Sequence, residues 1–136
     1  MAGVKKIDHV AIAVKSIDES RLWFEQVYGA RYLGQKENVE MEYIVAYFLM
    51  GESLITMLEG TTPESFVTQH IEKRGEGIQH VAFRVENIEA ALEELKTKGI
   101  RLIDEKPRRG AGGVKIAFLH PKATNGILVE LCEKKD

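Results

Sequence analysis

The chain has 136 residues, a net charge of −2 and 44% hydrophobic residues, which is the size and composition of one globular domain. No apolar run reaches the ~18–20 residues that cross a bilayer, and the near-neutral charge argues against extensive nucleic-acid binding. Cys132 is the only cysteine, which excludes an internal disulfide and a cysteine zinc cage. The amino terminus runs into an alternating strand pattern rather than a signal-peptide core. We therefore expect a soluble, cytoplasmic protein with no nucleic-acid or membrane partner.

Strand and helix patterns alternate along the chain. β-branched and aromatic residues predict strands, and apolar residues at a helical period followed by a glycine predict helices. In chain order the expected elements are a strand at 7–14, a helix at 18–28, strands at 43–50 and 53–59, a helix at 63–74, a strand at 78–85, a helix at 88–98, and strands at 114–119 and 126–132. The helix at 63–74 is expected to start at Thr62-Pro63, because proline suits a first helical turn.

The two halves of this series repeat each other. Residues 7–14 (IDHVAIAV) align with 78–85 (IQHVAFRV), and the similarity continues beyond the first helix of each half. The further aligned pairs are 29–31 with 99–101, 46–49 with 116–119 (which pairs Phe48 with Phe118), Thr56 with Glu130, and Glu59 with Glu133.

This repeat predicts an α+β fold of two tandem modules, each with a strand, a helix and three strands (βαβββ). The modules are expected at about 5–60 and 76–134 of a single domain, joined by a connecting helix at about 62–75. A sheet this small leaves one face uncovered. We therefore expect a curved sheet around a shared cleft.

The repeat also places a histidine at the same point of both modules, at His9 and His80. Either histidine alone would more often be a structural residue, but neutral imidazoles that converge from equivalent strands are good ligands for first-row metals. Glu130 would complete the set, since it lies in the apolar run 126–132, where an unpartnered charge is costly. An edge-strand glutamate that faces water is the alternative for Glu130, and this segment does not separate the two.

Several segments resemble the methylmalonyl-CoA epimerase family of the vicinal oxygen chelate (glyoxalase-like) superfamily, which also contains lactoylglutathione lyase. They are the repeated opening (IDHVA and IQHVA) and the stretches 72–85 (EKRGEGIQHVAFRV), 106–113 (KPRRGAGG), 118–122 (FLHPK) and 126–131 (GILVEL). The resemblance covers nearly the whole chain. It implies paired βαβββ modules, a divalent metal ion (Co, Mn, Ni or Zn), a homodimer, and epimerisation of (R)- and (S)-methylmalonyl-CoA in propionate metabolism. By position, it implies His9, His80 and Glu130 as the metal ligands.

Two positions depart from the family's pattern. The family often has a fourth ligand, Gln or Glu, where this chain has Thr56, so a water molecule could fill that place. Some members have a catalytic glutamate where this chain has Val45. The nearest acids, Glu40 and Glu42, would face the other side of a regular strand unless a bulge intervenes, and a solvated surface position is the simpler interpretation for both. Glu130 is then the one catalytic candidate, and the second acid–base group is left open.

A basic segment distinguishes the second module. Residues 101–122 contain six basic and two acidic residues, a net charge of +4 in a chain of net charge −2. With the resemblance, we interpret the segment as the binding region for an anionic acyl-CoA substrate, since charged side chains and backbone amides both bind anions. The candidate contacts are Arg109, Gly110, Gly112, Gly113 and Lys122. A solvated hairpin loop is the alternative.

The site residues do not separate an epimerase from a lactoylglutathione lyase-type isomerase, and Thr56 gives some support to a non-catalytic ligand-binding protein. We expect His70 on the surface of the connecting helix and His120 in a turn. Cys132 is expected to be buried near the end of the last strand. The aromatic residues of the first helix, Trp23, Phe24 and Tyr28, are expected in the core or in a subunit contact.

Overall fold

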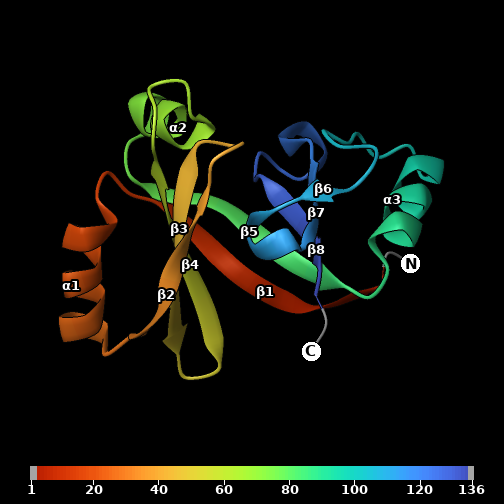
Figure 1. The fold of residues 1–136 in the computed structure, drawn as a ribbon. Coiled ribbons are helices and arrows are strands. Elements are labelled where there is room, and N and C mark those ends of the chain that lie inside the picture. The colour runs from red at the N-terminus through yellow and green to blue at the C-terminus, as the bar shows by residue number, and fades with distance from the viewer. Residues whose placement is uncertain (1–2, 135–136) are drawn as a thin grey trace. The chain divides into compact units, whose positions relative to one another are not determined.

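A computed structural model describes residues 3–134 of the chain. The elements, labelled in Figure 1, are β1 (Val4–Ala13), α1 (Ile17–Tyr28), β2 (Arg31–Asn38), β3 (Tyr43–Met50), β4 (Ser53–Gly60), α2 (Phe66–Arg74), β5 (Gly77–Val85), α3 (Ile88–Thr97), β6 (Arg108–Arg109), β7 (Lys115–Leu119) and β8 (Val129–Glu133). Short 3-10 turns η1 (Ala111–Gly113) and η2 (Pro121–Ala123) lie on either side of β7. The chain divides into two compact units. His9–Gln79 forms the middle unit, and the chain up to Asp8 together with the chain from His80 onward forms the split unit.

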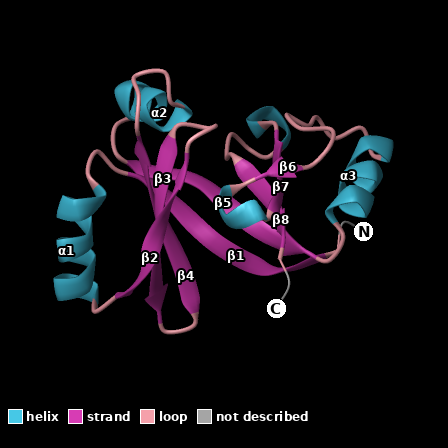
Figure 2. Cartoon of the chain, viewed as in Figure 1, coloured by secondary structure: helices cyan, strands magenta, loops and turns pink. Residues whose placement is uncertain are grey.

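The middle unit contains the strand order β2-β3-β4-β1, with residues 9–13 of β1, together with α1 and α2 (Figure 2). β1 pairs with β4 in parallel, and β3 pairs with both β2 and β4 in the antiparallel sense. Its core includes Ile17 of α1, Phe48 of β3 and Met57 of β4, all buried, with Phe24 packed against them. α1 begins where the Ser16 side chain accepts a hydrogen bond from the Glu19 amide, a helix N-cap.

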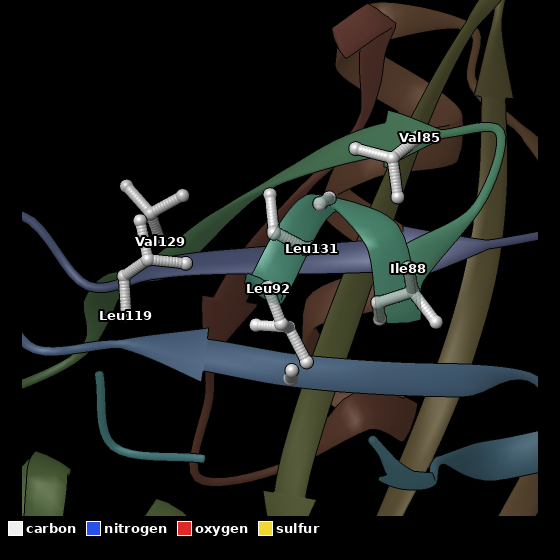
Figure 3. Packing of buried hydrophobic residues seen from close by; sticks show 8 residues of the cluster. Val85, Ile88, Leu92, Leu119, Val129 and Leu131 are labelled. Atoms are coloured by element: carbon white, nitrogen blue, oxygen red, sulfur yellow. The ribbon is translucent and has the colours of Figure 1, made fainter. Parts of the chain in front are cut away.

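The split unit contains the strand order β5-β8-β7-β6, with β5 and β8 parallel and the other two pairs antiparallel. α3 covers one face of this sheet, and Figure 3 shows Ile88 and Leu92 of the helix beside the strand residues Val85, Leu119, Val129 and Leu131. Because side chains alternate along a strand, Glu130 and Cys132 of β8 point to the other face. That face is formed by Ala82, Ile116, Phe118 and Cys132.

The predicted α+β fold with two βαβββ modules is confirmed, as are the helices predicted at 18–28 and 88–98. The ranges of β2 and β6 were not predicted. β2 is an edge strand whose exposed residues are mostly polar, and β6 has only two residues, so neither has the apolar alternation of a half-buried strand.

Two predicted boundaries are wrong by about three residues. α2 begins at Phe66 rather than at Thr62-Pro63, because Ser65 caps the helix by accepting a hydrogen bond from the Val67 amide. β8 begins at Val129 rather than at residue 126, because η2 precedes it and Gly126 has a positive φ of 80°.

The predicted alignment of the third strand of each module is wrong by one residue. In the middle unit Tyr47 of β3 pairs with Thr56, and in the split unit Phe118 of β7 pairs with Glu130. Tyr47 is therefore the equivalent of Phe118, a position that the sequence alignment assigned to Phe48. Two aromatic residues in succession made the shifted alignment equally good by residue type.

The remaining predicted positions are partly confirmed. Cys132 is fully buried, and His120 lies in a turn, where its Nδ1 accepts a hydrogen bond from the Lys122 amide. Phe24 packs into the core, whereas Trp23 and Tyr28 are more than half exposed. His70 is half-buried in α2 rather than fully on the surface. Among residues 3–134, no helix is long and apolar enough to cross a membrane.

Candidate metal centre

The strand register gives the two histidines equivalent positions. In the middle unit Ala11 of β1 pairs with Thr56 of β4, and in the split unit Ala82 of β5 pairs with Glu130 of β8. His9 and His80 each lie two residues before these alanines, so they project from the same face of their strands as Ala11 and Ala82 do. The alignment of Thr56 with Glu130 is therefore confirmed by backbone pairing.

His80 and Glu130 form a buried pair within the split unit. His80 is 5% exposed and Glu130 is 6% exposed, and Nε2 of His80 lies 3.3 Å from Oε2 of Glu130. The Phe118 ring, beside Glu130 in the strand register, meets the imidazole edge-on at 5.5 Å between centroids. The aromatic contact restricts rotation of the imidazole ring, and the pair offers one nitrogen and one carboxylate that could bind a metal ion.

His9 follows Asp8 directly in β1 and is half-buried. His9 of the middle unit, like His80 and Glu130 of the split unit, offers one atom that could bind a metal ion. Two imidazoles and one carboxylate are a donor set that suits a first-row divalent cation.

Burial dominates the electrostatics of Glu130. Loss of hydration raises the pKa of this carboxyl to about 8, and the negative charge of Asp8 acts in the same direction, whereas Lys134 and Arg108 oppose it. A carboxyl with this pKa exchanges its proton near neutral pH. A bound cation would compensate the charge that burial disfavours, which is the environment expected of a metal ligand.

Asp8, the neighbour of His9, is part of a buried charge cluster that sequence reasoning missed. Its Oδ1 accepts a hydrogen bond from Nε of Arg84 at 2.9 Å and lies 2.8 Å from a terminal nitrogen of the same guanidinium. Its Oδ2 accepts a hydrogen bond from Nζ of Lys134 at 2.7 Å. The Asp8 side chain has no exposed surface. A charged residue inside an otherwise apolar strand is the signal that could have revealed it, because such a charge needs partners.

This chain has Thr56 and Val45 at the two positions where the resemblance implies a polar group. Thr56 is 2% exposed, and Val45 is 4% exposed on the same face of the sheet of the middle unit, since it pairs with Leu58, two residues from Thr56. Glu40 and Glu42 lie in the turn before β3, so strand alternation does not govern them. Glu40 is exposed, and Glu42 has a positive φ of 61°.

The predicted substrate segment is exposed except at one glycine. Arg109 and Lys122 are exposed, Gly112 and Gly113 have positive φ values of 74° and 79°, and Gly110 is buried. A Cβ at Gly110 would lie 3.0 Å from the Ile116 side chain, so the backbone passes close to β7 there. Sequence reasoning named Arg109 and missed Arg108, whose guanidinium lies over the Phe118 ring.

The sequence profile of the glyoxalase/bleomycin resistance protein/dioxygenase superfamily matches residues 8–118. The chain belongs to this superfamily. Among its relatives, the uncharacterized protein YqjC of Bacillus subtilis is 41% identical over 132 residues, which cover 97% of this chain and 94% of YqjC. The mitochondrial methylmalonyl-CoA epimerase of Dictyostelium discoideum is 34% identical over 133 residues, which cover 97% of this chain and 80% of the epimerase.

A solved structure gives the same family. Methylmalonyl-CoA epimerase in complex with methylmalonyl-CoA and NH4+ is 31% identical, with a TM-score of 0.92 over 97% of this chain and 96% of that one. The resemblance to methylmalonyl-CoA epimerases inferred from the sequence is therefore confirmed.

Proposed function

We propose that this protein is a metal-dependent epimerase that interconverts (R)- and (S)-methylmalonyl-CoA, with His9, His80 and Glu130 as the ligands of a divalent cation such as Co, Mn, Ni or Zn. The observation that carries the proposal is the buried His80–Glu130 pair, with Nε2 and Oε2 3.3 Å apart, in a chain whose relatives include methylmalonyl-CoA epimerases. The residue types alone do not select among these metals.

The reaction moves a proton at C2, between a carboxylate and a thioester. A divalent cation bound by the three residues would supply Lewis-acid stabilisation of the negative charge that develops when C2 loses its proton. Glu130 acts as the base on one face of C2, because a carboxylate oxygen can accept the C2 proton there. A second acid–base group must act on the opposite face of C2. Val45 cannot transfer a proton, so this group does not lie at the position where some family members have a catalytic glutamate.

The remaining parts of the proposal concern the substrate and the assembly. Arg109, Gly110, Gly112, Gly113 and Lys122 contact the anionic CoA portion, which suits the net charge of +4 in residues 101–122. The protein acts as a cytoplasmic homodimer. The family resemblance supports both statements.

Proton exchange tests the activity. The purified protein is incubated with Co²⁺ and methylmalonyl-CoA in deuterated water, and C2 labelling is followed by mass spectrometry. We expect exchange with the wild type and a loss of at least about 100-fold with Glu130→Gln, since general acid–base catalysis contributes about 10²–10⁴-fold. Absence of exchange with every divalent metal would refute the epimerase proposal.

Metal binding tests the ligand set separately. His80→Ala should abolish stoichiometric Co²⁺ binding in titration calorimetry, because it removes one ligand of the buried His80–Glu130 pair. Tight binding by this variant would refute the set.

A ligand-binding protein without turnover is the second candidate, and Thr56 favours it, because its side chain does not supply the Gln or Glu that the family often has there. The exchange experiment separates the two. Tight binding of methylmalonyl-CoA with no C2 labelling would indicate the binding protein, and labelling would exclude it.

A further inference from the structure

Arg108 of β6 lies on the same face of the split unit as Glu130. It pairs with Ile116 of β7, and Ile116 shares its face with Phe118. Phe118 in turn pairs with Glu130 of β8. The register thus places Arg108 on the face opposite α3, where Glu130 also points.

Two contacts orient the Arg108 guanidinium. Its central carbon lies 5.4 Å from the Phe118 ring centroid, a cation–π contact, and Nε lies 3.3 Å from Oδ2 of Asp104. The same Asp104 oxygen accepts a hydrogen bond from the Phe118 amide at 2.9 Å, so Asp104 is itself attached to β7. The Arg108 side chain is therefore pre-oriented although it is 44% exposed.

The two terminal nitrogens of Arg108 have no hydrogen-bonded partner among residues 3–134. These nitrogens form the part of a guanidinium that binds a carboxylate through two parallel hydrogen bonds. The Phe118 ring, which makes the cation–π contact with Arg108, also contacts the His80 imidazole at 5.5 Å between ring centroids. A free anion-binding group thus lies one aromatic ring away from a proposed metal ligand.

We propose that Arg108 binds the free carboxylate of a malonyl-type thioester and makes the protein selective for such substrates over acyl-CoA esters without a carboxylate. This inference rests on the proposed function, since it assumes a CoA thioester near His80 and Glu130. It assigns Arg108 a specificity role distinct from that of Arg109, which the sequence associates with the CoA portion. Arg109 pairs with Lys115 and so occupies the alternate position on the two-residue strand.

Malonyl-CoA and acetyl-CoA differ only in the carboxylate, so their relative affinity isolates the proposed contact. Titration calorimetry with the Co²⁺-loaded protein should show tighter binding of malonyl-CoA by the wild type. Arg108→Gln should reduce that preference by about tenfold or more, the size of a charge-assisted hydrogen bond, while the affinity for acetyl-CoA stays the same. Arg108→Lys, which keeps the charge and loses the planar fork, should show an intermediate preference.

The matched control is Arg31→Gln, which removes an exposed arginine from β2 of the middle unit and should keep the wild-type preference. The inference is wrong if the wild type shows no preference, if Arg108→Gln keeps it, or if Arg108→Gln weakens both ligands equally, as a purely structural role would. C2 exchange by the wild type is measured in parallel. Exchange with an unchanged preference in Arg108→Gln overturns only this inference, and a lost preference without exchange overturns only the epimerase proposal.

Discussion

Asp8 is a fully buried carboxylate that contacts two cations, Arg84 and Lys134, in the split unit. Removing the charge of one member of a buried ionic cluster leaves the others uncompensated, which costs about 3 kcal/mol or more. We expect Asp8→Asn to lower the free energy of unfolding by this amount in urea denaturation of the metal-free protein.

The control for this prediction is the exposed pair of Arg21 and Glu25, four residues apart on α1 at 2.9 Å. Glu25→Gln should cost no more than about 0.5 kcal/mol, because solvent screens a surface pair. If the two substitutions lower the free energy of unfolding equally, the Asp8 cluster stabilises the fold no more than a surface ion pair does.

Glu130 makes the stability of the metal-free protein depend on pH. Burial raises the pKa of this carboxyl from 4.5 to about 8, so the native state binds a proton more tightly than the unfolded chain does. The free energy of unfolding should therefore fall as the pH rises from 4.5 to about 8, because ionisation is easier after unfolding.

Glu130→Gln tests this dependence, since glutamine resembles the protonated carboxyl and does not ionise. The stability of the variant relative to the wild type should increase with pH across that interval, measured by urea denaturation in the presence of a chelator. The comparison cancels the titration of other groups. A difference that does not change with pH would contradict the raised pKa.

At the scale of secondary-structure elements, the first helix of each module begins with the same kind of hydrogen bond, from a backbone amide to a glutamate carboxylate. The Ile17 amide donates to Glu59 at 2.7 Å at the start of α1, and the Ile88 amide donates to Glu133 at 2.9 Å at the start of α3. Each carboxylate comes from the strand that closes its module. It accepts a hydrogen bond from the first helical amide, and it lies at the positive end of the helix dipole.

Glu59→Gln and Glu133→Gln should each lower the free energy of unfolding by about 1 kcal/mol, because a charge-assisted hydrogen bond becomes a neutral one. Glu52→Gln, at an exposed position in the turn before β4, is the control and should change it little. Urea denaturation measures all three. If Glu59→Gln and Glu133→Gln lower the free energy of unfolding no more than Glu52→Gln does, these contacts do not stabilise the protein.

At the scale of the whole molecule, a bound metal should stabilise the fold by mass action. Free Co²⁺ at about 100 times its dissociation constant adds about 2.7 kcal/mol to the free energy of unfolding if it binds only the native state. We expect Co²⁺ to raise the wild-type melting temperature and a chelator to reverse the shift. His80→Ala should lose the shift.

His70→Ala is the matched control for this shift, because His70 is a half-buried histidine of α2 outside the proposed ligand set. This variant should melt at a higher temperature with Co²⁺, as the wild type does. Loss of the Co²⁺ shift in His70→Ala, or its retention in His80→Ala, would contradict the assignment of the ligands.

The sequence by itself determined the repeat, and with it the α+β modules and the equivalence of His9 with His80 and of Thr56 with Glu130. These features follow from residue type at matched positions, because the same alternation of apolar residues produces the same strand twice. The tertiary structure decided the register of β3 against β7, the edge strands β2 and β6, and the partners of Asp8 and Arg108. Those depend on hydrogen bonds and charge contacts between distant segments, such as Asp8 with Arg84, and neither composition nor local spacing encodes them.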